Sequence, residues 1–402
     1  MRSAKQAFAY SSPHEAIDAM LGRLAPVERQ ALDWRRAAGR ILAQPLLADR
    51  DSPPCDVTAV DGFAVRLADV AAGSLPIRSE ARIGQRPIDL PAGGAARIVT
   101  GAPIPTGAEA VVRREDVNEF GDRIEFKAGS QAIRAGQDIR RQGENLLAGQ
   151  QVVEAGHEIR GPVLAALSTF GASNVGVRRK VRVGVVVTGD ELLEADARPA
   201  PWQLRDANGP ALLAMLSAAP WIELGAICHA PDEADPLRAR LGEQLSACDA
   251  VLLTGGVSMG DRDHVPAVVE SLGAKIIFHR LPIRPGMPVL GAIGEGGKAI
   301  LGLPGNPVSV MVTACRFASP VLRRLAGATV PQRPAVKLAS GDDATIRMWW
   351  YRLVRLAADG QVELVPNRGS GDLVAAARSD GFVEVPPGEK GAGPWRMYAW
   401  TM

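Results

Sequence analysis

The sequence predicts a multidomain α/β fold, in which a doubly wound α/β domain accompanies a β-rich domain and a C-terminal β-barrel or sandwich. Three observations support this prediction. Continuous apolar runs alternate with helical patterns between 182 and 303, short runs rich in Gly and Pro fill 51–149, and short β-type runs return after 326. A length of 402 residues also corresponds to roughly three domains.

The composition excludes several classes of protein. The chain carries 46 basic and 44 acidic residues, and a net charge of +2 indicates neither a nucleic-acid partner nor an anionic membrane surface. No apolar stretch reaches the length of a membrane span, and the N-terminus shows no apolar secretory segment. The cysteines stand far apart without CxxC spacing, so we expect reduced thiols and a cytoplasmic protein: Cys55, Cys228, Cys248 and Cys315.

The first element is a well-marked helix. Ser12 suits the N-cap, Pro13 the first helical position and Glu15 the third, and an apolar face follows them. We expect a second helix over 31–43 that ends near Pro45.

The middle of the chain then alternates between β and α/β character. Strands are expected at 97–99, 110–112 and 123–126, and a helix at 161–168. Further strands are expected near 182–187, 222–227, 249–253, 275–279 and 298–303, with helices near 208–219, 233–247 and 264–272. This βαβ rhythm is typical of a parallel sheet covered on both faces.

Three glycine-containing turns follow buried strands of this sheet. They begin at Thr188-Gly189, at Thr254-Gly255-Gly256 and at Leu303-Pro304-Gly305. The carboxyl ends of parallel strands meet at one edge, so we expect the turns to form one cleft. In the third turn, Asn306 is the expected cap of a helix whose free N–H groups suit an anion, so the cleft should take a phosphorylated ligand.

Acidic side chains accompany these turns. Asp190, Glu191 and Asp263 lie in or beside them. Paired carboxylates at strand ends hold Mg²⁺ while a phosphate completes its coordination shell. We therefore expect a magnesium site here.

Two other motifs are weaker. The segment 256–260 has the GxSxG pattern of a hydrolase nucleophile, but no histidine follows His279, so Ser258 is better interpreted as a phosphate or metal contact. The segment 294–299 has a GxGxxG-like pattern, but it precedes a strand. It is therefore interpreted as a hairpin turn and not a dinucleotide site.

Taken in order, several segments resemble those of the molybdopterin molybdenumtransferases, the family of MoeA and the gephyrin E domain. Examples are Thr-Gly-Asp-Glu-Leu at 188–192 and Leu-Pro-Gly-Asn-Pro-Val-Ser at 303–309. The other matching segments are 60–64, 100–112, 139–145, 254–263, 285–288, 369–373 and 379–382. The resemblance covers essentially the whole chain.

This resemblance implies four domains and a reaction. The domains are a helical linking domain (1–50 and 147–178), an inserted β-rich domain (51–146), a three-layer α/β molybdopterin-binding domain (179–326) and a C-terminal β-barrel (327–402). It implies a homodimer whose cleft lies between the α/β domain of one subunit and the β-rich domain of the other. The implied reaction is Mg²⁺-dependent insertion of molybdate into adenylylated molybdopterin with release of AMP, and a molybdopterin adenylyltransferase would supply the substrate.

The resemblance also implies roles for individual residues. Asp61 and Glu144 would face the reacting end of the substrate, and Asp190, Glu191 and Asp263 would bind or position Mg²⁺. The phosphates and pterin would be held by Thr188, Gly189, Thr254, Gly255, Gly256 and Ser258. Molybdate would lie near Arg284, Pro288, Pro304, Gly305, Asn306 and Ser309, within reach of Arg347, Arg352 and Ser370.

Some positions depart from the family pattern. Asn145 replaces the Asp of Gly-Glu-Asp, Arg284 replaces the first Lys of Lys-Pro-Gly-Lys-Pro, and Met287 replaces the second. Two alternatives therefore stay open beside the transferase. One is a non-catalytic molybdopterin-binding scaffold; the other is a molybdopterin adenylyltransferase, which needs no β-rich insert.

Overall fold

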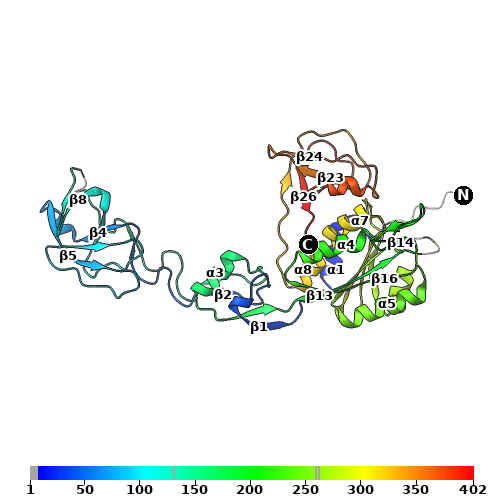
Figure 1. Cartoon of the computed structure of the whole chain (residues 1–402), viewed down its shortest axis with the longest axis horizontal. Coiled ribbons are helices and arrows are strands. Elements are labelled where there is room, and N and C mark those ends of the chain that lie inside the picture. The colour runs from blue at the N-terminus through cyan, green and yellow to red at the C-terminus, as the bar shows by residue number, and fades with distance from the viewer. Residues whose placement is uncertain (1–7, 130–131, 259, 261–262) are drawn as a thin grey trace. The chain divides into compact units, whose positions relative to one another are not determined.

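The computed structural model describes residues 8–129, 132–258, 260 and 263–402. Figure 1 shows the course of the chain. The described residues fold into two compact units. The first unit comprises the described residues within 1–44, 155–164 and 174–402. The second unit comprises those within 45–154 and 165–173.

The centre of the first unit is a six-stranded sheet in the order β16-β13-β17-β21-β20-β18. Its strands are β13 (Val181–Thr188), β16 (Ile222–Ala230), β17 (Ala250–Thr254), β18 (Lys275–His279), β20 (Leu290–Ile293) and β21 (Ala299–Leu303). The first four strands in this order pair in parallel, which confirms the predicted α/β fold. The prediction missed β20, which runs antiparallel to β21 in a hairpin. The turn predicted at 294–299 joins them, and Gly294 N–H donates to the Lys298 carbonyl over 2.8 Å.

Helices cover both faces of this sheet, as the alternation of apolar side chains in β13 requires. Val183, Val185 and Val187 pack in one core, whereas Val186 packs in the other. The first core contains α4 (Asn208–Ser217), α7 (Pro307–Thr313) and α8 (Ser319–Leu325), and the second contains α5 (Ala234–Ala247) and α6 (Val265–Ser271). A π-helical turn, Ala314–Ala318, joins α7 to α8.

The N-terminal region confirms one predicted helix and overturns another. Helix α1 (Pro13–Leu21) begins as predicted, with Ser12 Oγ accepting the Glu15 N–H over 3.2 Å. The helix expected over 31–43 is wrong. Strand β1 (Arg29–Asp33) and a 3₁₀ turn, Trp34–Arg36, lie there instead. Strand β1 pairs antiparallel with β12 (Asn174–Arg178), so a long-range pairing overrides the local helical pattern.

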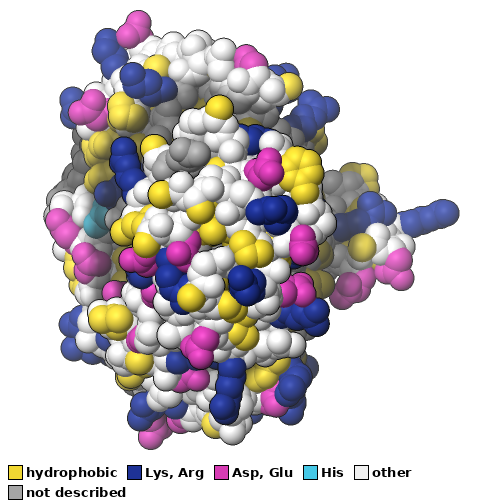
Figure 2. Space-filling view, turned by 90° about the vertical axis from the view of Figure 1, so that its left-hand side faces the viewer, with side chains coloured by type: hydrophobic (Ala, Val, Ile, Leu, Met, Phe, Trp, Pro, Cys, Tyr) yellow, Lys and Arg dark blue, Asp and Glu magenta, His cyan; other side chains and the backbone are white. Residues whose placement is uncertain are grey.

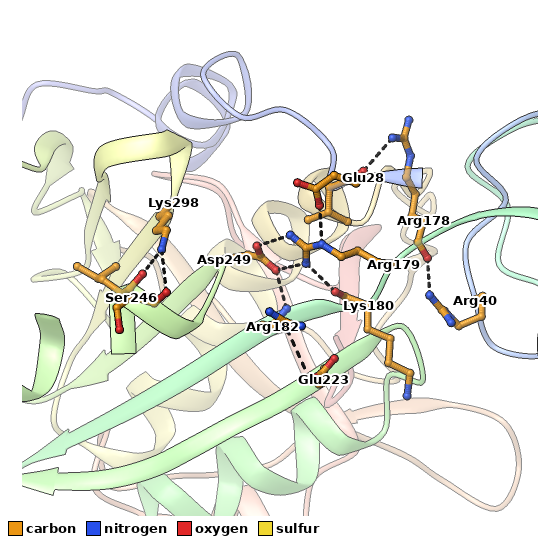
Figure 3. Close-up of polar contacts among 12 residues, drawn as sticks. Glu28, Arg40, Arg178, Arg179, Lys180, Arg182, Glu223, Ser246, Asp249 and Lys298 are labelled. Atoms are coloured by element: carbon orange, nitrogen blue, oxygen red, sulfur yellow. Dashed lines mark hydrogen bonds and ion pairs between the residues drawn. The ribbon is translucent and has the colours of Figure 1, made fainter. Parts of the chain in front are cut away.

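A polar network fastens this β1–β12 ribbon to the α/β domain (Figure 3). Arg179 directs its two terminal nitrogens to the Asp249 carboxylate over 2.6 and 2.7 Å, and its Nε to Glu28 over 2.5 Å. Asp249 also accepts the Arg182 N–H over 2.8 Å. Since Asp249 immediately precedes β17 and Arg182 lies near the start of β13, this network occupies the amino-terminal edge of the sheet, opposite the three turns.

A β-rich domain completes the first unit. Its strand order is β19-β23-β25-β26-β22, and β24 pairs with β23. The strands are β19 (Ile283–Arg284), β22 (Ala335–Val336), β23 (Trp349–Leu356), β24 (Val362–Leu364), β25 (Gly381–Val385) and β26 (Trp395–Ala399), and α9 (Leu373–Ala377) lies between β24 and β25. A buried ion pair ties this sheet to the π-helical turn, with Arg316 Nε 3.0 Å from Glu384 Oε1.

The second unit is built around another six-stranded sheet, in the order β7-β4-β6-β5-β9-β8. Its strands are β4 (Gly62–Val65), β5 (Ser74–Ala81), β6 (Ala95–Ile98), β7 (Ala110–Arg113), β8 (Val117–Phe120) and β9 (Arg123–Phe126), and β6, β7 and β9 confirm the predicted strands. The sheet carries an apolar core on each face, with Phe63 and Val112 in one and Ala64 and Val111 in the other.

Shorter elements complete the chain. They are α2 (Leu67–Val70), α3 (Gly161–Thr169), β2 (Leu46–Leu47), β3 (Val57–Thr58), β10 (Ile139–Arg140), β11 (Gln151–Val153), β14 (Leu192–Leu193) and β15 (Leu204–Arg205). Helix α3 confirms the helix predicted at 161–168. Within the described ranges, no helix has the length and apolarity needed to cross a membrane. Figure 2 shows acidic and basic side chains intermixed on the face that it presents.

Candidate active site

The three predicted turns lie side by side at the carboxyl edge of the α/β sheet. Val187 pairs with Thr254, and Thr254 pairs with Leu303, so the neighbouring strands end in register. The Gly255 N–H donates to the Leu303 carbonyl over 3.1 Å. The edge therefore brings together segments that are more than a hundred residues apart in the sequence.

Glycine is required where two of these turns touch. Gly255 has a φ of +87°, and a Cβ built there would lie 2.6 Å from Thr188 Oγ1 and 2.9 Å from the Thr188 carbonyl oxygen. A side chain at 255 would therefore be strained and would collide with its neighbour. Glycine at 255 therefore lets the second turn pack closely against Thr188.

Buried polar atoms without partners also gather at this edge. Thr188 Oγ1, Thr254 Oγ1 and Asn208 Oδ1 are buried and find no hydrogen-bond partner in the described part of the chain. Buried polar groups are normally satisfied, so such atoms point to a water or a ligand.

Asn208, which the sequence interpretation missed, binds one of the turns directly. Its Nδ2 donates to the Gly305 carbonyl over 2.8 Å, and its own N–H donates to Asp206 over 2.8 Å. The signal that was available is the Asp-Ala-Asn-Gly-Pro run at 206–210, which is typical of an N-terminal helix turn.

The predicted metal ligands are held by neighbouring backbone groups. Asp190 Oδ1 accepts the Asp232 N–H over 3.1 Å, and Asp263 Oδ2 accepts the Gly260 N–H over 2.6 Å. Glu191 is exposed. Ser258, also exposed, follows the second turn, and its neighbours Met259, Asp261 and Arg262 lie outside the described residues. Among the described residues, no group of three or more His, Cys, Asp or Glu side chains forms a metal cluster.

A cavity of about 680 Å³ opens next to the third turn. It lies between the start of α7, the segment 283–288 and the C-terminal β-rich domain. Of the residues predicted to surround molybdate, it is lined by Arg284, Pro288, Pro304, Asn306, Ser309 and Ser370. Gly305, Arg347 and Arg352 are not part of the described lining.

Asn306 occupies the N-cap position of α7, but its side chain makes no capping bond. Its Nδ2 donates instead to Ser370 Oγ over 3.0 Å, and the Ser370 carbonyl accepts the Val308 N–H over 3.1 Å. The expectation that the helix start leaves its N–H groups free is therefore wrong for Val308.

Arg352 points elsewhere. Its Nη1 donates to Asp342 Oδ1 over 2.9 Å, and its guanidinium lies 4.4 Å from the centre of the Trp350 ring. The hydrogen bond from Arg352 lowers the pKa of Asp342. Because this ion pair occupies the guanidinium, the structure does not bring Arg352 to the cavity.

The second unit holds the two remaining predicted carboxylates. Asp61 Oδ1 accepts the N–H and the hydroxyl of Thr100, each over 2.7 Å. Glu144 accepts from Arg140 Nε over 2.5 Å and from the Arg141 N–H over 2.9 Å. These hydrogen bonds lower the pKa of Asp61 and of Glu144, so both carboxylates are charged at neutral pH.

Backbone pairing brings together the loops that carry these carboxylates. Arg140 pairs with Val57, and the Gly101 N–H donates to the Thr58 carbonyl over 2.9 Å. The segments 57–61, 99–101 and 139–145 thus meet at one place in the second unit, and they overlap three of the segments that the resemblance singled out.

Comparisons with known proteins agree with this architecture. Family models match in order the MoeA N-terminal region (domains I and II) at 11–171, a probable molybdopterin binding domain at 184–324 and the MoeA C-terminal region (domain IV) at 344–394. A molybdopterin molybdenumtransferase of Synechococcus elongatus is 34% identical over 94% of this chain and 96% of its own length. One of Staphylococcus epidermidis is 31% identical over 94% of this chain and 92% of its own.

A solved structure agrees as well. The molybdopterin biosynthesis moeA protein of Pyrococcus horikoshii OT3 is 25% identical and superposes with a TM-score of 0.79, covering 96% of this chain and 99% of that one.

By its fold and its glycine-rich edge, the protein is a multidomain α/β protein with a molybdopterin-binding type of domain. The chain belongs to the molybdopterin molybdenumtransferase family, as the matches over nearly its whole length show. Its function therefore lies in molybdenum cofactor biosynthesis, and it is a transferase.

Proposed function

We propose that this chain inserts molybdate into adenylylated molybdopterin, with Mg²⁺-dependent release of AMP. The observation that carries the proposal is the cavity in the first unit, where Arg284, Ser309 and Ser370 line a space beside the third glycine turn. Molybdate is a tetrahedral dianion, and a guanidinium with two hydroxyl groups offers it charge and hydrogen-bond donors.

The glycine turns would hold the rest of the substrate. Backbone N–H groups at Gly189 and Gly256 suit phosphate oxygens, whereas the Gly255 N–H already donates to the Leu303 carbonyl. The buried hydroxyls of Thr188 and Thr254 are available to a ligand. The pterin and phosphates would thus lie along the carboxyl edge, with the molybdate cavity at its end.

Mg²⁺ would be held by Asp190, Glu191 and Asp263. Proteins often bind Mg²⁺ through one or two carboxylates together with substrate phosphates, so this donor set fits the ion without a larger cluster. When bound, the ion would neutralise charge on the phosphates and favour cleavage of the phosphoanhydride. The backbone bonds to Asp190 and Asp263 would keep these carboxylates oriented.

The proposal includes a homodimer in which Asp61 and Glu144 of one subunit act on substrate held by the other. Mixing two inactive variants tests this. Asp61→Asn and Arg284→Ala homodimers should both be inactive, and subunit exchange between them should restore about a quarter of the wild-type activity. No restored activity in exchanged dimers would show that both residues must come from one chain.

The proposal further includes a cytoplasmic location, where the four free cysteines stay reduced, and a molybdopterin adenylyltransferase as the partner that supplies the substrate. A molybdopterin adenylyltransferase would instead consume ATP, and this distinguishes its activity from that of the transferase.

The deciding experiment incubates the purified protein with adenylylated molybdopterin, with and without molybdate and Mg²⁺, and measures AMP. A transferase releases AMP only when both are present. A scaffold binds the substrate and releases no AMP, and an adenylyltransferase consumes ATP with molybdopterin. Either of the last two results would overturn the proposal.

A further inference from the structure

We propose that Arg368 supplies the second positive charge of the molybdate site, in place of the lysine that the family pattern has at position 287. This inference rests on the proposed function and names one more residue for the same site. Position 287 departs from the family pattern, because it is a methionine, which carries no charge and cannot bind an oxyanion.

The Met287 side chain lines the cavity but faces another arginine. Arg280 Nη2 lies 3.7 Å from the Met287 sulfur. Met287 therefore fills part of the wall as an apolar group and leaves the cavity without the cation expected there.

Arg368 lines the same cavity from another segment of the chain. It belongs to the segment 367–370, whereas Arg284 and Met287 belong to the segment 283–288, which begins with β19. Its side chain is exposed, and its charge acts on Asp372 without a contact short enough for an ion pair among the described residues. A guanidinium that lines a cavity without a carboxylate partner is free to bind an anion.

The backbone that carries Arg368 is fixed at both ends. Its N–H donates to Asp372 Oδ2 over 3.0 Å, and Asp372 also caps α9 through the Ala375 N–H. Two residues later, Ser370 is bonded to Asn306 and Val308 at the start of α7. The Arg368 side chain therefore starts from a position defined relative to the cavity.

The charge balance agrees with this assignment. The cavity lining includes Arg284 and Arg368 and, among the described residues, no carboxylate. Two unpaired guanidiniums match the two negative charges of molybdate, and charge-assisted bonds of this kind are the strong ones.

The experiment measures molybdate binding directly, by equilibrium dialysis of the substrate-free protein and elemental analysis for molybdenum. Arg368→Gln should weaken molybdate binding roughly tenfold or more, because one charge-assisted contact is lost. Arg368→Lys should keep most of the affinity. In the Arg368→Gln background, Met287→Lys should return the affinity to within about threefold of wild type, since a cation then stands at the family position.

Arg378→Gln is the matched control, because Arg378 follows α9 in the same domain and is not part of the described cavity lining. Its molybdate affinity should equal that of wild type. If wild type and Arg284→Ala differ in molybdate affinity but Arg368→Gln matches wild type, the inference is overturned and the proposed function stands. If wild type itself neither binds molybdate nor releases AMP, the proposed function fails first.

Discussion

Asn306 Nδ2 donates a hydrogen bond to Ser370 Oγ over 3.0 Å, and this bond joins the third glycine turn of the α/β domain to the C-terminal β-rich domain. Both residues line the cavity proposed for molybdate. The bond replaces the capping interaction that Asn306 was expected to make with its own helix. The cavity is therefore formed by two domains, and Asn306 makes one of the contacts between them.

Ser370→Ala tests whether this contact supports molybdate binding. Loss of the hydroxyl removes the acceptor of Asn306 and a donor in the cavity, so the KM for molybdate should rise about tenfold. Steady-state AMP release at varied molybdate concentration measures the effect. Ser340→Ala is the control, since Ser340 is exposed in the same domain and does not line the cavity. Equal KM values for both variants and wild type would contradict the prediction.

The replacement of the family's aspartate by Asn145 should have little effect on the rate of AMP release. Asn145 Oδ1 accepts from Arg140 Nη2 over 2.9 Å, and Arg140 also binds Glu144. An aspartate would offer Arg140 the same oxygen, so Asn145→Asp should release AMP at a rate within about twofold of wild type.

Asn145→Ala removes this acceptor and should slow AMP release by roughly threefold or more, because Arg140 then positions Glu144 less firmly. Asn118→Ala, at an exposed position of strand β8, serves as the control. A large gain of activity in Asn145→Asp would mean instead that the missing negative charge limits the reaction.

A third prediction concerns the contact between Gly255 and Thr188, which belong to two neighbouring turns. Gly255→Ala places a methyl group against Thr188 at a positive φ, so it should destabilise the first unit by about 2 kcal/mol or more. Gly273→Ala is the matched control. Gly273 has a φ of +76° with nothing within 4 Å of a built Cβ, so it should cost only about 1 kcal/mol. Urea unfolding measures both, and equal costs would show that the contact with Thr188 does not matter.

The sequence predicted those parts of the fold that depend on local pattern. The apolar runs at 182–187, 249–253 and 298–303 became buried neighbouring strands, and Ser12 caps α1 as expected. Buried parallel strands leave a clear signal because both of their faces are covered.

The errors arose where a distant partner decides the structure. The residues expected as a helix over 31–43 include the end of β1, which pairs with β12 some 140 residues later in the chain. Strand β20 was missed for another reason, because it is a short strand inside a hairpin. Arg352 carries the right charge for an anion, but its guanidinium is already paired with Asp342. Arg368 and Asn208 stood in no familiar motif, and only the folded chain places them at the site.

The last prediction concerns the network at the opposite edge of the sheet. Asp249 is half-buried, which opposes its ionisation, but the paired bonds from Arg179 and the Arg182 N–H outweigh burial and lower its pKa. Asp249→Asn removes the charge that Arg179 binds, and should destabilise the first unit by about 2 kcal/mol at neutral pH. Asp196→Asn, at an exposed position, is the control.

The pH dependence of this effect follows from the direction of the pKa shift. Because the folded pKa of Asp249 lies below the unfolded value of about 3.9, the carboxylate contributes its full stabilisation above that pH. This contribution is lost as the pH falls through the folded pKa. The stability difference between wild type and Asp249→Asn, measured by urea unfolding, should therefore be constant from about pH 7 to pH 5 and shrink below about pH 4. A difference that persists unchanged at about pH 3 would mean that shape, and not charge, makes Asp249 necessary.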